Sequence, residues 1–355
     1  MDFRELIIKN SEVLLEAIRK LNETGKKILL VVDDNDKFIG TLTDGDIRRY
    51  ILRTGGITGI VDDATCKNPF TVHPGYDRES VKKVMKENLI ELVPVIDGDG
   101  RIIEVIFSER EYKHTETKPL FSVDTSAVIM AGGAGTRLKP FTNVLPKALI
   151  PYGDKSAIEH IIHSLCNYGI KEIWVSVYHK SRIMKLYLNE LNLPCELKLV
   201  EEDTPLGTFG VLFLIKDKIK YENVLVTNCD TILDIDYFDL YAMHKKNKND
   251  ITVVVAIKSM KIPYGICEIT DGGELKRIIE KPESPFLVVV GTYLIHKSAL
   301  EIIEEKKPLD AITFINTAKK LKKKVGIYPV RETQWMDLGN WEEYLKSLKF
   351  LSEKE

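Results

Sequence analysis

Residues 127–151 read AVIMAGGAGTRLKPFTNVLPKALIP, an apolar run followed by a glycine-rich loop and a basic segment. The apolar run, Ala127–Met130, predicts a buried strand. The loop after it contains closely spaced glycines, Gly132, Gly133 and Gly135. Because glycine has no Cβ, such a loop can approach a polyphosphate closely and turn its N–H groups towards it. The stretch therefore predicts a phosphate site at the end of a strand.

Two basic side chains accompany this loop. Arg137 follows the glycines directly, and Lys147 lies further along the same stretch. A guanidinium can chelate phosphate oxygens through two hydrogen bonds, and an ammonium group adds a point charge. The stretch does not end in the Gly-Lys-Ser/Thr of a P-loop, and Leu138 occupies the third glycine position of a dinucleotide fingerprint. The predicted phosphate site is therefore of another kind.

Strands and helices alternate in the pattern that follows. Ile173–Val177 and Val224–Thr227 predict further strands. A helix is predicted before both of them, with Asp154 as its expected cap and with an apolar face formed by Ile158, Ile161, Ile162 and Leu165. Alternation of this kind predicts an α/β fold with a mostly parallel sheet covered by helices on both faces. In such sheets, ligands bind beyond the carboxyl ends of the strands.

Two aspartates are candidate metal ligands. Asp230 comes shortly after the strand predicted at 224–227, and Asp337 lies in the segment Trp335-Met336-Asp337-Leu338-Gly339. An aspartate by itself is more often a cap or turn residue than a ligand. A phosphate loop in the same chain reverses that expectation, because Mg²⁺ is usually held by one or two carboxylates together with substrate phosphates.

The string G-G-x-G-T-R-x-x-P-x-T-x-x-x-P-K-x-L-x-P, read from Gly132, resembles the signature of sugar-1-phosphate nucleotidyltransferases, and the likeness extends over roughly residues 125–345. The resemblance implies a Rossmann-like mixed, mostly parallel sheet and Mg²⁺ as the cofactor, held by Asp230 and Asp337. It also implies that Arg137 lies on the leaving β,γ-phosphates and that Lys147 neutralises charge near the α-phosphate. The nucleotide-binding residues that it implies in the loop are Ala131, Gly132, Gly133, Gly135 and Thr136.

Residues 201–210, EEDTPLGTFG, resemble the loop E-x-x-P-L-G-T-A-G of the same family, which implies Glu202 and Gly207 as nucleotide-binding residues. A carboxylate only accepts hydrogen bonds, so Glu202 suits the N1–H and N2–H₂ edge of guanine, whereas the carbonyls of thymine or uracil would repel it. GTP is therefore the expected nucleotide. Two alternatives stay open: an alignment shifted to Glu201, and a Glu202 side chain that points to solvent. Phe209 replaces a small residue and is expected to tighten the floor of the pocket.

Two later segments resemble the family's sugar site. Pro263-Tyr264-Gly265-Ile266 and Ile279-Glu280-Lys281-Pro282 imply Gly265 and Glu280 as ligands of sugar hydroxyls. Lys281 is implied as a sugar-binding and catalytic residue that holds the sugar phosphate. Val289 stands where the family has an asparagine, which removes an expected sugar contact.

Residues 1–116 contain an internal repeat, with copies at about 1–62 and 63–116, in which Asp33 corresponds to Asp97 and Ile39 to Ile103. Each copy predicts a helix, a strand, a turn and a second strand, and a unit this short must pack on its neighbour.

The repeat resembles a tandem CBS (cystathionine-β-synthase-type) pair, an α+β module. The best match is GTLTDGDIR in the first copy, which implies Thr43 and Asp46 as ligands of an adenine nucleotide. The second copy departs from the pattern at Glu104 and Arg110. A regulatory nucleotide site and a module used only for dimerisation and folding both stay open, and a homo-oligomer formed through the pair is expected.

Length and composition are those of an ordinary globular protein with room for two domains. A polar stretch without periodicity predicts a linker at 117–124, and the resemblance implies a nucleotidyltransferase domain at 125–355. Lys and Arg total 51 against 53 Asp and Glu, a formal net charge of −2, which gives no general basic face for nucleic acid or membrane. The five cysteines are scattered without a CxxC pair, so neither a disulfide framework nor a zinc site is expected. The sequence shows no signal peptide and no bilayer-spanning run, so a cytoplasmic location is expected.

The expected reaction is GTP + sugar 1-phosphate ⇌ GDP-sugar + pyrophosphate, in class EC 2.7.7. A CBS pair ahead of a minimal transferase resembles a bacterial subgroup of surface-sugar biosynthesis, which includes glucosamine-1-phosphate guanylyltransferases of legionaminic acid pathways. This likeness implies glucosamine 1-phosphate first, then mannose 1-phosphate or another substrate of an NDP-sugar pyrophosphorylase. The rival interpretation is a nucleotide-sensing regulatory protein that binds without turnover.

Overall fold

The computed structural model describes residues 2–108 and 124–352, and the chain divides into two compact units. The first unit comprises Met1–Glu116 together with Ile257–Leu287, and the second comprises Thr117–Ala256 together with Val288–Glu355. Arg110 and most of the linker predicted at 117–124 lie outside the described residues. None of the helices in the described ranges has the length and hydropathy of a bilayer-spanning segment.

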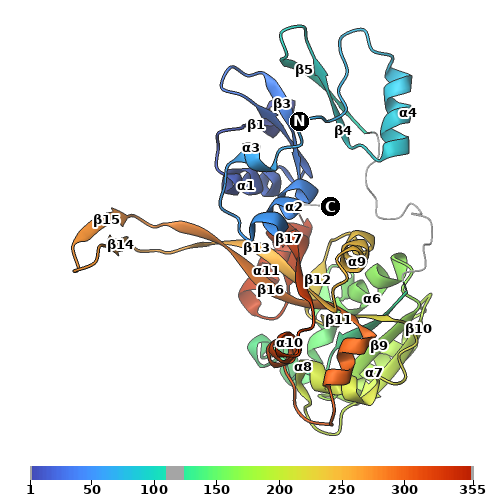
Figure 1. The fold of residues 1–355 in the computed structure, drawn as a ribbon. Coiled ribbons are helices and arrows are strands. Elements are labelled where there is room, and N and C mark those ends of the chain that lie inside the picture. The colour runs from blue at the N-terminus through green and yellow to red at the C-terminus, as the bar shows by residue number, and fades with distance from the viewer. Residues whose placement is uncertain (1, 109–123, 353–355) are drawn as a thin grey trace. The chain divides into compact units, whose positions relative to one another are not determined.

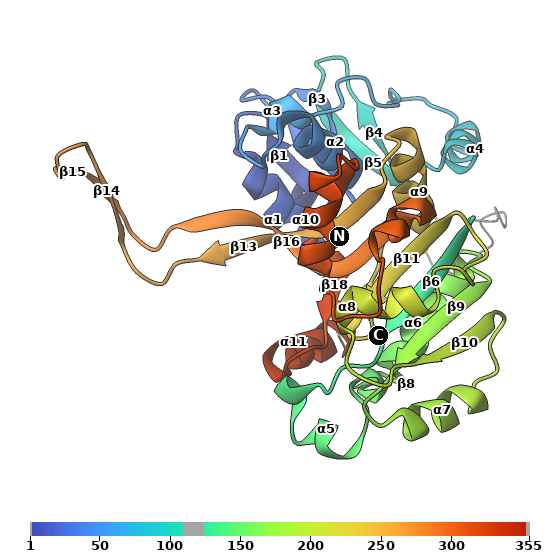
Figure 2. The same ribbon diagram turned by 60° about the horizontal axis from the view of Figure 1, so that its bottom comes forward.

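A seven-stranded sheet forms the centre of the second unit. Its strands, in spatial order, are β10 (Glu196–Glu201), β9 (Glu172–Val177), β6 (Thr125–Met130), β11 (Asn223–Asn228), β16 (Glu283–His296), β13 (Ile251–Lys261) and β17 (Val325–Arg331). The first four strands are parallel, and β16 runs antiparallel to β11. Figure 2 shows β11, β6, β9 and β10 side by side in that order. The predicted α/β class with a mixed, mostly parallel sheet is therefore confirmed.

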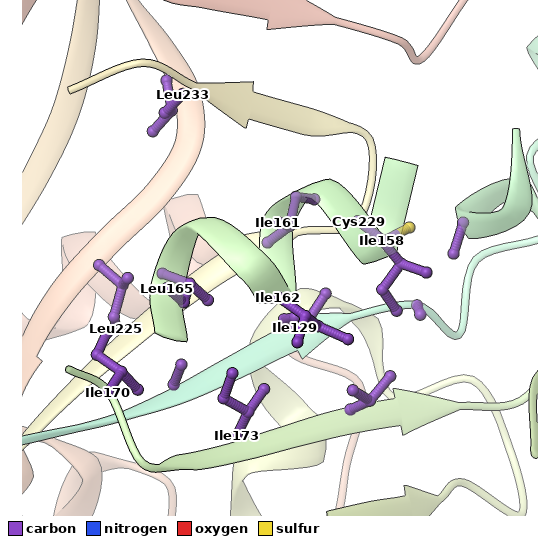
Figure 3. Packing of buried hydrophobic residues seen from close by; sticks show 14 of the residues in the cluster. Ile129, Ile158, Ile161, Ile162, Leu165, Ile170, Ile173, Leu225, Cys229 and Leu233 are labelled. Atoms are coloured by element: carbon purple, nitrogen blue, oxygen red, sulfur yellow. The ribbon is translucent and has the colours of Figure 1, made fainter. Parts of the chain in front are cut away.

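The helix predicted after the first strand is α6 (Ala157–Asn167). Its N-cap is Ser156, whose hydroxyl accepts from the Glu159 N–H at 3.3 Å. The expectation that Asp154 caps this helix is wrong, because the helix begins two residues too late for that side chain to reach its first turn. The apolar face of α6 packs on the sheet in the main hydrophobic core. Figure 3 shows Ile158 and Ile162 over Ile129 and Ile173 of the strands.

Shorter elements complete the second unit (Figure 1). The further helices are α5 (Phe141–Val144), α7 (Ser181–Glu190), α8 (Gly207–Gly210), α9 (Tyr237–Lys246), α10 (Ala311–Lys320) and α11 (Trp341–Ser352). Two small antiparallel pairs join β7 (Pro151–Tyr152) to β8 (Lys155–Ser156), and β12 (Thr231–Leu233) to β18 (Trp335–Asp337).

The first unit shows the predicted repeat. The first copy has β1 (Ile7–Lys9), α1 (Leu14–Thr24), β2 (Ile28–Val32), β3 (Phe38–Thr43) and α2 (Asp44–Thr54), followed by α3 (Val61–Ala64). The second copy has α4 (Arg78–Asn88), β4 (Leu92–Ile96) and β5 (Ile102–Phe107). The β2–β3 and β4–β5 pairs have the same antiparallel arrangement, and each carries a bulge near its turn. The two turns also meet, because the Phe38 N–H donates to the Gly100 carbonyl at 2.8 Å.

Residues 257–287, which cluster with the first unit, contain an antiparallel ribbon of β14 (Ile266–Ile269) and β15 (Leu275–Ile279). Arg19 of α1 bonds Glu283 in this segment, with 2.5 Å between Nη2 and Oε2.

Candidate active site

The candidate site begins at the carboxyl edge of the parallel strands. Strands β6, β9 and β11 all end there, so the loops that follow them meet. The Ala131 N–H donates to the Ser176 carbonyl at 3.1 Å, and the His179 N–H donates to the Gly132 carbonyl at 3.4 Å. These bonds attach the start of the glycine loop to the end of β9.

The glycine loop is shaped by contacts that leave no room for a side chain at Gly135. Its φ is +64°, and a Cβ on this residue would lie 2.9 Å from Cβ of Lys147 and 2.8 Å from the Thr142 methyl. The Thr142 hydroxyl donates to the Gly135 carbonyl at 2.8 Å. The loop therefore holds the stem of Lys147 against its backbone, while Gly133 and Thr136 stay exposed to solvent.

The two aspartates are brought together by the short β12–β18 pair. Thr231, the residue after Asp230, lies opposite Asp337 in this pair. The Leu338 N–H donates to the Asp230 carbonyl at 2.8 Å, which fixes the two strands at this point. Residues more than a hundred positions apart in the sequence thus become neighbours at one end of the sheet.

Gly339 marks the point at which three functional side chains converge. A Cβ on Gly339 would lie 2.5 Å from Asp230 Oδ2, 2.8 Å from Asp337 Oδ1 and 3.4 Å from Arg137 Nη2. The two carboxylates and the guanidinium therefore surround one small space that only glycine leaves open. Sequence reasoning gave Gly339 no role, although a glycine two residues after a candidate ligand was a signal for it.

Acidic and basic side chains lie together beside Gly339. Lys147 forms an ion pair with Asp230, and both side chains are largely buried, with 14% and 8% of their surface exposed. Burial raises the pKa of the Asp337 carboxyl, and the neighbouring Asp230 charge raises it further. Two effects oppose this rise in the pKa of Asp337. The Gly339 N–H donates to Asp337 Oδ1 at 2.7 Å, and Lys147 and Arg137 add positive charge nearby.

This arrangement fits a divalent cation. The two carboxylates point into one space, and burial together with the Asp230 charge raises the pKa of the Asp337 carboxyl, an effect that a bound cation would oppose. Within residues 2–108 and 124–352 no group of three or more His, Cys, Asp or Glu side chains gathers for a metal. Mg²⁺ does not require such a group, since it binds one or two carboxylates and completes its shell with water and substrate phosphates.

Glu202 lies at the same edge and is buried, with 7% of its surface exposed. Its Oε2 accepts the Leu206 N–H at 2.9 Å, and its Oε1 lies 2.6 Å from where a Cβ on Gly132 would be. Burial raises the pKa of the Glu202 carboxyl, against hydrogen bonds from Leu206 and the Ser176 hydroxyl. The alternative that Glu202 points to solvent is therefore wrong. Glu201 is the exposed residue of the two, and it pairs with Lys185 at 2.6 Å.

The segment after Glu202 folds against the backbone of Leu309. Gly207 has φ +69°, and a Cβ there would lie 2.9 Å from the Leu309 carbonyl oxygen. The backbone conformation and the lack of space therefore explain why this position is a glycine. Phe209 is fully buried, with its ring 4.6 Å from that of Phe314 and 5.2 Å from that of Tyr293. Phe209 was expected to tighten the floor of the base pocket. Its ring instead packs in the core between α8, α10 and β16, because an aromatic ring this large fills the interior.

The predicted sugar-site residues lie on the segment that clusters with the first unit. Gly265, Glu280 and Lys281 are all exposed. A Cβ on Gly265 would lie 3.0 Å from Glu280 Oε2, so the ribbon brings these two residues together as the resemblance implies. Lys281 has φ +45° and lies 3.9 Å from the Glu280 carboxylate.

The CBS motif residues form a helix cap. The Asp46 N–H donates to the Thr43 hydroxyl at 3.2 Å, and the Thr43 N–H donates to Asp46 Oδ2 at 2.9 Å, a capping box at the start of α2. Arg49 bonds the second oxygen of Asp46 at 2.5 Å. The structure therefore explains both residues without a ligand, and their role in nucleotide binding stays a prediction.

Comparisons with known proteins agree with this geometry. Residues 126–354 match the family described as "Nucleotidyl transferase", and residues 4–53 and 61–107 match the CBS domain. The mannose-1-phosphate guanylyltransferase catalytic subunit beta of Dictyostelium discoideum is 30% identical over 228 residues, 62% of this chain and 63% of that protein. The mannose-1-phosphate guanyltransferase of Schizosaccharomyces pombe is 32% identical over 230 residues, 62% of each chain. The chain thus spans less than two thirds of the length of the curated relatives it matches.

Among solved structures, a putative glucose-1-phosphate thymidylyltransferase from Bacillus anthracis has the same fold, with a TM-score of 0.51 and 23% identity. The likeness covers 64% of this chain and 94% of that one.

Proposed function

The chain belongs to the nucleotidyl transferase family, and from this we propose that it transfers a nucleotidyl group from an NTP to a sugar 1-phosphate with release of pyrophosphate. The observation that carries the proposal is the convergence of Asp230, Asp337 and Arg137 on the space beside Gly339, next to the glycine loop. Attack on an α-phosphate spreads negative charge over oxygens, so the reaction needs positioned positive charge more than it needs covalent chemistry.

The chain's own residues suit that task. The exposed N–H groups of the glycine loop and Arg137 would bind the β- and γ-phosphates, and Lys147 would lie near the α-phosphate. Asp230 and Asp337 would hold Mg²⁺, which supplies positive charge to the phosphates and orients them. Since a sugar phosphate oxygen is already ionised at neutral pH, no protein nucleophile or general base is required. Lys281, with Gly265 and Glu280, is proposed to bind the sugar phosphate.

GTP is the proposed nucleotide. Glu202 is buried at the base of the loop, where it accepts from the Leu206 N–H and the Ser176 hydroxyl, and the remaining lone pairs of its carboxylate could accept the N–H groups of guanine. The curated relatives named mannose-1-phosphate guanylyltransferases support the same nucleotide. For the sugar, their names favour mannose 1-phosphate, while the fused CBS pair is the ground for glucosamine 1-phosphate.

The direct test measures pyrophosphate release by the full chain in the presence of Mg²⁺. Each of the four NTPs, and dTTP as a fifth nucleotide, is tested separately with a panel of sugar 1-phosphates. We expect GTP with mannose or glucosamine 1-phosphate to give the highest rate. Faster release with UTP or dTTP would overturn the guanine assignment and leave the reaction class intact. No release with any pair, together with measurable nucleotide binding, would favour a sensor without turnover.

For the first unit we propose an adenine-nucleotide site or a dimerisation module, as the CBS match allows. Calorimetry of the full chain with AMP, ATP and GTP distinguishes them when combined with the Thr43→Ala variant. Binding of AMP or ATP that this variant abolishes supports the nucleotide site. Light scattering that shows a dimer without such binding supports the dimerisation role.

A further inference from the structure

Strand β11 ends at Asn228, which lies directly across from Gly291 in the antiparallel β11–β16 pair, one position beyond Thr227 and Thr292. A Cβ on Gly291 would collide with the Asn228 amide nitrogen and would lie 3.0 Å from its Cγ. Gly291 also has φ +82°. The glycine thus leaves space that the Asn228 carboxamide occupies.

The Asn228 carboxamide is half-buried and forms no hydrogen bond with any group in residues 2–108 and 124–352. Its neighbours differ in this respect. The Thr227 and Thr292 hydroxyls bond each other at 2.8 Å, and the Thr231 hydroxyl donates to the Val290 carbonyl at 3.0 Å. Because the neighbouring hydroxyls are satisfied within the protein, the half-buried Asn228 amide has its bonding capacity available for water or a ligand.

The position of Asn228 connects it with the reacting end of the site. It precedes Asp230 by two residues, and Cys229 between them belongs to the hydrophobic core. Asn228 is the last residue of β11, and Asp230 lies in the turn that follows it, so both belong to the carboxyl edge of the sheet. Val289 lies two residues before Gly291 and exposes 53% of its surface, so an isopropyl group stands where the resemblance led us to expect an amide.

We propose that Asn228 is a specificity-determining residue whose carboxamide hydrogen-bonds the sugar of the sugar 1-phosphate, a contact that Val289 cannot make. The inference rests on the proposed function. An amide donates through Nδ2 and accepts through Oδ1, so it can bond a hydroxyl or an amino substituent of a hexose. A site that uses such a group discriminates strongly, because a substrate without the matching substituent leaves the amide unpaired.

The test compares four full-length proteins: wild type, Asn228→Ala, Asn228→Ala with Val289→Asn, and Thr227→Val as a matched control one residue earlier. Pyrophosphate release is measured against the sugar 1-phosphate and against the NTP separately, and Tm is recorded for each protein. We expect Asn228→Ala to raise KM for the sugar 1-phosphate roughly tenfold to a hundredfold with KM for the NTP unchanged. The added Val289→Asn change should restore part of that loss, and Thr227→Val should lower Tm without changing either KM.

The possible results separate the two ideas. An active wild type whose sugar KM is unaffected by Asn228→Ala overturns the inference and leaves the proposed function standing. An inactive wild type with every pair of substrates overturns both. If Asn228→Ala fails to fold, Asn228→Ser and Asn228→Leu replace it; equal sugar KM values for these two variants and the wild type would also contradict the proposal.

Discussion

The two motif-bearing regions of this chain use their polar residues in opposite ways. At the start of α2, Thr43, Asp46 and Arg49 bond one another within a few residues of sequence, so these three side chains are explained by the helix that they cap. At the edge of the large sheet, Asp230 and Asp337 are held beside each other although both are acidic. Burial, and to a smaller extent the charge of Asp230, raise the pKa of the Asp337 carboxyl, so its ionised form is disfavoured there.

The two regions therefore differ as evidence for a ligand. A capping box stabilises its own helix and needs no ligand to explain it. Two carboxylates held close together and shielded from water cost free energy unless positive charge accompanies them, and such pairs are typical of functional sites. The comparison therefore favours the sheet edge as the reacting centre, and variants in the two regions should behave differently.

The largest effect is expected at the aspartate pair. Asp230→Asn and Asp337→Asn should each lower pyrophosphate release roughly a thousandfold, because each removes a charge that would hold Mg²⁺ at the phosphates. Because burial and Asp230 raise the pKa of Asp337, its ionised form is disfavoured in the folded state, so Asp337→Asn should keep or raise Tm at neutral pH. Asp46→Asn in the CBS motif is the control, and it should leave the transferase rate of the second unit unchanged. A wild-type rate in either aspartate variant would contradict the proposed centre.

The next effect concerns Glu202. The pKa of the Glu202 carboxyl is raised, so this carboxyl takes up a proton at a higher pH than an ordinary glutamate does. The protonated form cannot accept both guanine N–H groups. KM for GTP should therefore rise towards acid pH. In Glu202→Gln this dependence should be lost and the preference for GTP over UTP should fall roughly tenfold to a hundredfold. Glu201→Gln, at the exposed neighbour, should behave as wild type; a shift there instead would move the assignment by one residue.

A smaller effect is expected for Lys147. Its ammonium group neutralises Asp230 in the protein without substrates, so a divalent cation has to compete with it. Lys147→Met should therefore bind Mn²⁺ about tenfold more tightly in the absence of nucleotide, even though turnover falls. Electron paramagnetic resonance of free Mn²⁺ measures this binding independently of activity. Lys180→Met is the control, since the Lys180 ammonium group donates to the Asn143 carbonyl at 2.9 Å and forms no ion pair with any group in the described ranges 2–108 and 124–352. Weaker Mn²⁺ binding in Lys147→Met would contradict the competition.

The smallest effect is expected at the CBS cap. Thr43→Ala should cost about 1 kcal/mol in the free energy of unfolding of the first unit, the usual loss for a capping side chain. Urea unfolding of the full chain measures it, and Thr43→Ser, which keeps the hydroxyl, should be close to wild type. A change in pyrophosphate release without any change in unfolding would show that Thr43 acts on the second unit instead of on its own helix.

Local patterns predicted much of this molecule because the signals are local. The strand Ala127–Met130 and the helix around Ile158 follow from apolar spacing, which is a property of neighbouring residues. The repeat in residues 1–107 follows from a period in the sequence, and the two β-pairs with matching bulges confirm it. The predicted cap of α6, Asp154, lies two residues before the actual cap, Ser156, because several polar residues near a helix start satisfy the same preference.

The fold class, the family and the residue types for binding phosphate could be predicted from local patterns, since glycines, basic groups and acidic groups can be recognised one at a time. Only the tertiary structure decided that Gly339 leaves space for Asp230, Asp337 and Arg137 to meet, that Glu202 and not Glu201 is buried beside Gly132, and that Phe209 packs in the core. Each of these facts depends on distances between segments far apart in the chain. Strand pairing and side-chain packing fix such distances, and the spacing of residues along the sequence does not record them.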